Sequence, residues 1–229
     1  MTHPYNKHSR FYLAVDCIIF GFDTKELKLL CIRRNFEPGK GKWSLMGGFL
    51  EMDESIDEAA ARVLYELTGI ENIYLEQLQG YGERDRDPAD RVISIAYYAL
   101  INSVKFENVI SDKYSASWFN INQIPELVFD HKEMVDKALR RLRRRCSTQP
   151  VGFELLPEKF TLPQLQNLYE KIFDREFDKR NFRKKILSPG ILKKLEEKER
   201  QSSRKGAFYY QFDKQRYDEL TNNGYNFDM

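Results

Sequence analysis

Acidic and basic residues spaced between positions 47 and 70 have the types needed for chemistry on a phosphate. Glu54 stands in a loop, and Arg62 and Glu66 follow within a helix predicted over residues 55–67. Carboxylates on one face of a helix can hold Mg²⁺, which bridges phosphate oxygens and helps to activate water. The carboxylates of this stretch are therefore candidates for a metal site.

The face of this helix that would bind the metal is mostly apolar. Positions 63, 66 and 67 lie within an arc of about 100°, and they are occupied by Val63, Glu66 and Leu67. Mg²⁺ requires near-octahedral oxygen ligands, so Glu66 alone makes a weak site. We therefore expect neither a metal ion nor a catalytic residue here.

The same stretch resembles the Nudix box, with which it shares Gly48, Glu54, Arg62, Leu64, Glu66, Gly69 and Ile70. In that family the loop–helix–loop binds a divalent metal ion and hydrolyses nucleoside diphosphates linked to another group. The resemblance identifies Glu51, Glu54, Arg62 and Glu66 as remnants of the box. For Arg62 we favour a salt bridge to Glu58 or Glu66, which lie four residues away on the helix, over a catalytic role.

A polar loop over residues 81–90 is a second candidate site. Arginine binds phosphate and aspartate binds sugar hydroxyls. The loop is therefore predicted to line a ligand pocket, together with Glu51 and Glu54, through Arg84, Asp85, Arg86 and Asp87. The alternative is that these loop charges pair with one another at the surface.

Charge is distributed unevenly along the chain. Residues 1–139 contain 16 Lys and Arg against 22 Asp and Glu, whereas residues 140–229 contain 21 Lys and Arg against 13 Asp and Glu. An acidic first part and a basic second part indicate two modules, of which the second faces a polyanion such as nucleic acid. The alternative is ordinary solvated lysine and arginine.

A short basic helix is predicted over residues 179–187. Phe182 and Ile186 form its inner face, and five basic residues suit the major groove of DNA: Lys179, Arg180, Arg183, Lys184 and Lys185. A hairpin follows, whose turn offers Ser203, Arg204 and Lys205 as a wing tip. A merely solvated helix and a hairpin without function are the alternatives.

The expected elements define two domains. Strands are predicted over 11–22, 27–34, 74–80, 91–101, 116–120, 191–198 and 207–212, and helices over 55–67, 131–145, 162–173 and 179–187. Strands interleaved with helices give an α/β (α+β) first domain, residues 1–149. Residues 150–229 follow a break near 146–152 and have the element order of a winged helix-turn-helix.

The predicted helix over residues 131–145 has two further notable features, its first residue and its basic end. His131 is interpreted as a residue at the helix start, since the three histidines form no metal cluster. The run from Arg140 to Arg145 contains five arginines around Leu142. It is interpreted as a cationic helix end that favours the macrodipole, with contact to the DNA backbone as the alternative.

A second resemblance covers nearly the whole chain, through residues 75–101, 129–143 and 153–187. These segments resemble the Nudix-related transcriptional regulators. The resemblance implies a Nudix-like α/β/α sandwich with a mixed sheet, a C-terminal winged helix-turn-helix, a homodimer, operator DNA as partner and a small-molecule effector. Among relatives that effector is ADP-ribose, a nicotinamide-pathway compound or a pentose such as arabinose.

The function predicted from the sequence is a ligand-responsive DNA-binding transcriptional regulator. Because the helix lacks the carboxylates that would hold a metal ion, we expect the effector to be a sugar and not ADP-ribose. This expectation points to a role in carbohydrate metabolism. The alternatives are a Nudix hydrolase acting on ADP-ribose or another nucleoside diphosphate derivative, and an inactive scaffold that binds protein or RNA. No cofactor is expected, with Mg²⁺ needed only if hydrolysis remains.

The composition excludes some other classes. No apolar run approaches 18 residues, so we expect no membrane span. The three cysteines, Cys17, Cys31 and Cys146, are far apart and show no metal-ligand spacing. A reduced, cytoplasmic protein without disulfides or zinc is therefore expected.

Overall fold

The computed structural model describes residues 4–106, 115–150, 152–200, 206–225 and 227–229. Its larger sheet is mixed and is built around β1 (Tyr12–Phe22), whose last nine residues are all buried. β1 runs antiparallel to β2 (Leu27–Arg33) and β4 (Met46–Phe49), and parallel to β6 (Val92–Asn102). The sheet is completed by β3 (Trp43–Ser44), β5 (Glu76–Tyr81) and β7 (Ala116–Asn120).

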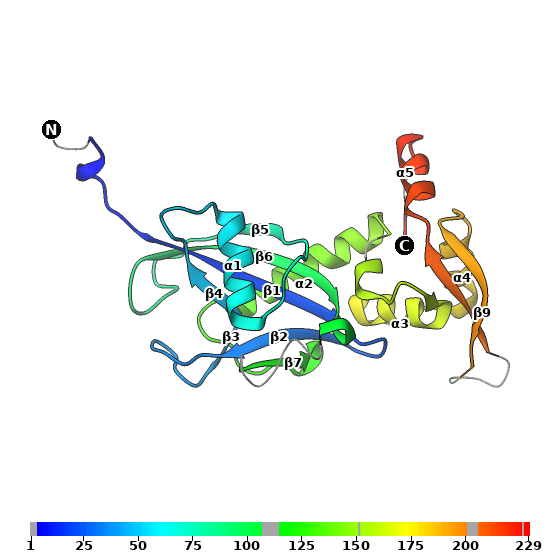
Figure 1. The fold of residues 1–229 in the computed structure, drawn as a ribbon, viewed down its shortest axis with the longest axis horizontal. Coiled ribbons are helices and arrows are strands. Elements are labelled where there is room, and N and C mark those ends of the chain that lie inside the picture. Colours follow the sequence, from blue (N-terminus) through cyan, green and yellow to red (C-terminus); the bar gives the residue numbers. More distant parts are fainter. Residues whose placement is uncertain (1–3, 107–114, 151, 201–205, 226) are drawn as a thin grey trace.

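Helices cover both faces of this sheet, α1 (Ile56–Thr68) on one and α2 (His131–Thr148) on the other (Figure 1). Alternate residues of β1 supply the two cores, because side chains of a strand point to opposite faces. Cys17 and Ile19 pack with α1, whereas Ile18 and Phe20 belong to the core that contains α2. The predicted α/β/α sandwich with a mixed sheet is confirmed.

The second unit contains α3 (Leu162–Phe173), α4 (Lys179–Leu187) and α5 (Lys214–Asn222), with a sheet in the order β8 (Phe160–Thr161), β10 (Ala207–Phe212), β9 (Leu192–Glu199). Thr161 caps α3 in a capping box with Gln164. Helix, turn, helix and hairpin follow in the order of a winged helix-turn-helix, which confirms that part of the predicted fold. Short 3₁₀ helices lie at Pro4–Lys7, Ser103–Phe106, Ile121–Gln123 and Phe153–Leu155.

The helix α2 is longer than predicted and joins the two units. Its residues 146–148 were expected to belong to the break between domains, but the helix continues to Thr148. Cys146 lies one turn after Leu142 on the same face, and both side chains are fully buried. Residues of α2 and α3 share one hydrophobic core, and the two helices meet at the C-terminal end of α2 (Figure 1).

None of the helices in the described part of the chain is both long and apolar enough to cross a membrane.

Candidate effector site and DNA interface

The remnant of the Nudix box is held together by Arg62. Its guanidinium donates to both carboxylate oxygens of Glu54 at 2.8 and 2.5 Å, to Glu66 at 3.2 Å and to the carbonyl oxygen of Phe49 at 2.9 Å. These bonds hold the pKa of Glu54 at about 2 and raise that of Arg62. The expected salt bridge to Glu66 is present, at 3.2 Å.

Of the two alternative partners predicted for Arg62, the structure shows Glu66 and not Glu58. Glu58 instead closes a capping box with Ser55, the residue before α1: Ser55 N donates to the Glu58 carboxylate at 2.8 Å, and Glu58 N donates to the Ser55 hydroxyl at 3.3 Å. Glu51 remains near Arg62, with its carboxylate 3.8 Å from the guanidinium.

The residues of the box do not fit a Mg²⁺ ion. Val63 is 2% exposed, and its Cγ2 lies only 2.6 Å from where a Cβ on Gly48 would stand. Leu67 packs against the same core. Both positions therefore serve packing, and Arg62 engages the carboxylates of Glu54 and Glu66. Within the described residues, no group of three or more His, Cys, Asp or Glu is placed to hold a metal ion.

A cavity of about 390 Å³ opens beside Gly47 and Gly48. Its walls combine aromatic rings with charged groups. The rings come from Tyr12, Phe36, Phe49 and Phe129, and the charged or titratable side chains from Asp16, Arg34, Glu37, Arg86, Asp87, Asp90 and His131. A few convergent polar groups in an apolar cleft of this size are typical of a small-molecule site.

A buried ionic network forms one wall of the cavity. Arg86 donates to both oxygens of Asp130, at 2.9 and 2.8 Å, and lies 3.5 Å from Asp16. Ser94 donates to Asp16 at 2.6 Å. Burial opposes the charge on Arg86, but Asp130 and Asp16 outweigh it and raise the pKa of the guanidinium.

His131 completes the network as a neutral ring. Its Nδ1 accepts a hydrogen bond from Leu45 N at 3.1 Å, so Nε2 carries the proton and faces Asp16 at 3.5 Å. Burial lowers the pKa of His131 against the opposing effect of Asp16 and Asp130. His131 begins α2, as predicted, and it also lines the cavity.

Arg34 lies between two aromatic rings at the cavity. Its guanidinium carbon is 4.3 Å from the ring centre of Phe36 and 5.2 Å from that of Phe129. Burial lowers the pKa of Arg34. The arrangement offers a cation for phosphate and flat apolar faces for a base.

The cavity contains only part of the predicted ligand set. Arg86 and Asp87 line it, but Glu51, Glu54, Arg84 and Asp85 do not. The side chains of Arg84 and Asp85 are 90% and 94% exposed and lie 4.0 Å apart. These two residues therefore follow the predicted alternative, in which the loop charges pair with one another at the surface. Glu54 is instead bound by Arg62.

Sequence reasoning missed the residues that come from other elements, above all Asp16, Arg34, Phe36, Phe129 and His131. A signal for Asp16 was present, because a carboxylate interrupts an otherwise apolar buried strand. The others had no local signal.

The basic helix α4 presents its cations to solvent. Phe182 and Ile186 are buried, and the Phe182 ring packs edge-on against Tyr169 of α3 at 5.8 Å. The five predicted DNA-binding residues of α4 are all exposed: Lys179, Arg180, Arg183, Lys184 and Lys185. Lys185 lies 3.4 Å from Asp228 of the C-terminal tail.

The predicted wing lies on β9 and β10, which pair antiparallel. Lys194 and Lys198 of β9 both lie over the ring of Phe208. The predicted wing-tip residues Ser203, Arg204 and Lys205 lie outside the residues that the structure describes.

Three arginines of the run at the end of α2 contact other elements of the same chain. Arg145 binds the Glu76 carboxylate and donates to Tyr98 OH, the latter at 2.8 Å, and Arg141 lies 3.6 Å from Glu76. Arg143 donates to the carbonyl oxygen of Ile172 in α3 at 2.6 Å. The run therefore joins α2 to β5, β6 and the winged helix.

The fold and these two sites define a class: a Nudix domain with an altered box, joined to a winged helix-turn-helix. Residues 10–138 match the family described as NUDIX domain, and residues 152–212 match the NrtR DNA-binding winged helix domain. The chain therefore belongs to the Nudix-related transcriptional regulators of the NrtR type.

Relatives and solved structures agree with this family. The ADPR responsive transcriptional repressor NtrR of Acinetobacter baylyi is 33% identical over 210 residues, which cover 90% of this chain and 84% of that repressor. The crystal structure of Shewanella oneidensis NrtR complexed with a 27mer DNA matches with a TM-score of 0.78 at 28% identity, covering 90% of this chain and 95% of that one.

Two further matches concern the first domain. The NUDIX domain of Shewanella oneidensis NrtR complexed with ADP ribose matches with a TM-score of 0.52 at 28% identity, over 62% of this chain and 94% of that domain. The ADP-ribose pyrophosphatase of Methanocaldococcus jannaschii is 34% identical over 134 residues, which cover 58% of this chain and 79% of that enzyme.

Proposed function

We propose that this protein is a transcriptional repressor that binds operator DNA through α4 and the β9–β10 hairpin, and that ADP-ribose in the cavity beside Gly47 is its effector. The observation that carries the proposal is the cavity itself. It is lined by two arginines, Arg34 and Arg86, and Arg34 lies against the rings of Phe36 and Phe129. A nucleoside diphosphate has the matching parts, namely two phosphates and a flat base.

The expected preference for a pentose such as arabinose is not supported. The repressor from Acinetobacter baylyi is named as responsive to ADPR, and the related Nudix domain was solved with ADP ribose. Our expectation rested on the missing metal face of α1. The cavity supports an alternative to a metal face, because Arg34 and Arg86 offer positive charge for a diphosphate without a metal ion.

The DNA-binding half of the proposal rests on the exposed cations of α4. Arg180 and Arg183 are proposed to read base edges, and Lys179, Lys184 and Lys185 to contact phosphates. We also propose the domain boundary at residues 149/150 and a homodimer on two half-sites related by a twofold axis.

A matched pair of aromatic substitutions tests the effector site. Phe36 and Phe11 are both about half exposed, at 54% and 53%, but only Phe36 lines the cavity. Stacking of a base on an aromatic ring is worth about 1–3 kcal/mol. Calorimetric titration with ADP-ribose should therefore show about 5- to 150-fold weaker binding for Phe36→Ala and unchanged binding for Phe11→Ala. Equal affinities for the two variants would remove the cavity from the proposal.

Hydrolysis of ADP-ribose is the second candidate function, favoured by the similarity to the pyrophosphatase. The box residues argue against it, since Val63 and Leu67 replace carboxylates. We expect turnover with Mg²⁺ or Mn²⁺ close to background. A rate on the order of 1 s⁻¹, which is usual for enzymes, would establish the hydrolase instead.

A further inference from the structure

The helix α2 reaches from the effector cavity to the DNA-binding domain. It contains 18 residues, which corresponds to about 27 Å at 1.5 Å per residue. Its first residue, His131, and the residue two before it, Phe129, line the cavity. A single helix therefore contacts the effector cavity at one end and α3 of the DNA-binding domain at the other.

The start of α2 is held by groups that a ligand would contact. Asp130 is the N-cap residue of α2, but its side chain makes no capping hydrogen bond. Its carboxylate is instead bound by both arms of Arg86. Phe129, just before it, has the positive φ of 53°, which a bulky side chain adopts only under strain. Its ring rests between Arg34 and His131.

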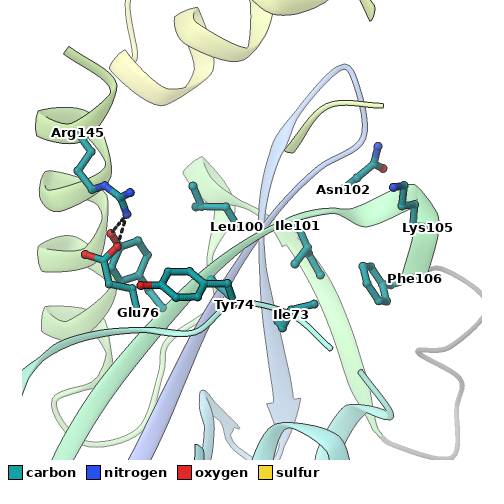
Figure 2. A pocket seen from close by; sticks show the side chains of 11 residues that line it. Ile73, Tyr74, Glu76, Leu100, Ile101, Asn102, Lys105, Phe106 and Arg145 are labelled. Carbon is teal, nitrogen blue, oxygen red and sulfur yellow. Dashed lines mark hydrogen bonds and ion pairs between the residues drawn. The ribbon is translucent and has the colours of Figure 1, made fainter. Parts of the chain in front are cut away.

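The other end of α2 is fixed to the second unit. Arg143 donates to Ile172 in α3 at 2.6 Å, and Met229 N donates to the Ser147 carbonyl oxygen at 3.0 Å. Figure 2 shows the last turn beside β5 and β6, where Arg145 reaches Glu76 at the wall of a second cavity of about 370 Å³. The helix α2 therefore links the effector cavity to α3, against which α4 packs.

We propose that the ion pair between Arg86 and Asp130 is the latch through which the ligand acts on DNA binding. The proposal rests on the proposed function, because it assumes ADP-ribose in this cavity. A diphosphate that binds Arg86 competes with the Asp130 carboxylate for the same guanidinium. Release of Asp130 frees the strained segment before α2, and the helix shifts the winged helix away from its DNA-binding arrangement.

The test uses the full chain with a matched control on the same helix. Asp130→Asn removes the charge that the latch needs, whereas Asp136→Asn removes an exposed carboxylate that pairs only with Lys132 among the described residues. Fluorescence anisotropy on a duplex from the upstream region of the gene gives the DNA affinity with and without saturating ADP-ribose. Calorimetry gives the affinity for ADP-ribose.

The latch predicts different coupling in the two variants. ADP-ribose should weaken DNA binding of the wild type and of Asp136→Asn by about tenfold or more, within the usual range of allosteric coupling. It should weaken DNA binding of Asp130→Asn by less than about twofold, although that variant still binds ADP-ribose. Full coupling in Asp130→Asn would overturn the latch and leave the effector assignment standing. Absence of ADP-ribose binding by the wild type would overturn both.

A second measurement needs no variant. In the wild type, ADP-ribose should speed hydrogen exchange of backbone amides over residues 131–135, because loss of the pair between Arg86 and Asp130 frees the first turn of α2. Exchange over residues 59–68 of α1 should stay unchanged. Unchanged or slower exchange over residues 131–135 with ligand bound would contradict the latch.

Discussion

Two helices of this protein, α1 and α4, carry arginine for opposite purposes. On α1, the guanidinium of Arg62 is bonded by Glu54, Glu66 and the backbone of Phe49. On α4, Arg180 and Arg183 are exposed and form no ion pair with any residue that the structure describes. A cation whose hydrogen bonds are met by its own chain supports the fold, whereas exposed arginines without an ion pair among the described residues favour an external polyanion.

The apolar residues of the two helices show the same contrast. In α4, Phe182 and Ile186 face α3 and leave the cations outside. In α1, Val63 and Leu67 face the sheet at positions where a Nudix box has carboxylates. This face of α1 is therefore part of the core, and the binding surfaces that we propose are the neighbouring cavity and α4.

The largest effect is expected from removal of the two arginines of α4. Arg180→Ala combined with Arg183→Ala should weaken operator binding by about 2–6 kcal/mol, because each base-reading arginine contributes about 1–3 kcal/mol. The control is Lys214→Ala combined with Arg216→Ala on α5, which removes the same charge and should change affinity less than about threefold. Mobility-shift titrations compare the two, and equal losses would end the assignment of α4 as the recognition helix.

The next effect concerns the converted face of α1. Val63→Glu should destabilise the protein by on the order of 3–5 kcal/mol, since it buries a charge against Gly48. Tyr65 is 52% exposed on the same helix, so Tyr65→Glu should cost less than about 0.5 kcal/mol. Urea unfolding with and without Mg²⁺ measures both. Recovery of Val63→Glu by Mg²⁺ would mean that this face still accepts a metal ion.

A smaller effect is predicted for pH, through His131. Burial holds its pKa in the folded protein below the ordinary value of about 6.5. The unfolded chain therefore binds the proton first, and stability falls as pH drops below about 6.5.

The variant His131→Asn isolates this effect. Its amide oxygen can still accept from Leu45 N, but the side chain does not titrate. Thermal unfolding between pH 7.5 and 5.5, on the order of one unit either side of the ordinary value, should show a steeper loss for the wild type than for His131→Asn. Parallel curves would show that other groups cause the loss.

The smallest effect is expected at the tail. Asp228 lies 3.4 Å from Lys185 of α4, and its side chain is 86% exposed. Such pairs are worth less than about 1 kcal/mol, so Asp228→Asn should strengthen DNA binding by no more than about fivefold. Asp218→Asn, which removes an exposed carboxylate of α5, is the control. Equal gains in both variants would indicate general charge repulsion, not competition for Lys185.

Local patterns predicted most of the elements. The hairpin of β1 and β2, the helices α1 to α4 and the strands β9 and β10 all follow from periodicity and turn residues. The helix α5 was missed because none of its residues is buried, so it carries no clear apolar stripe. The last residues of α2, 146–148, were not predicted as helical. The basic residues between 140 and 145 obscure the apolar face to which Leu142 and Cys146 belong.

The site was less predictable than the fold, for physical reasons. Asp16, Arg86 and His131 meet only because β1 pairs parallel with β6 and α2 packs behind them. Local sequence patterns do not predict which residues of distant elements come into contact. For Arg62 the sequence left two partners open, Glu58 and Glu66, although the spacing of Ser55 and Glu58 is itself a capping-box signal that assigns the Glu58 carboxylate to the start of the helix.

The most direct test of the account is a titration of the complex between the full-length protein and its upstream DNA. ADP-ribose is added in one series and arabinose in a matched series, and fluorescence anisotropy follows release of the DNA. The account predicts release by ADP-ribose and none by arabinose. Release by arabinose alone, or a complex that responds to neither compound, would contradict it.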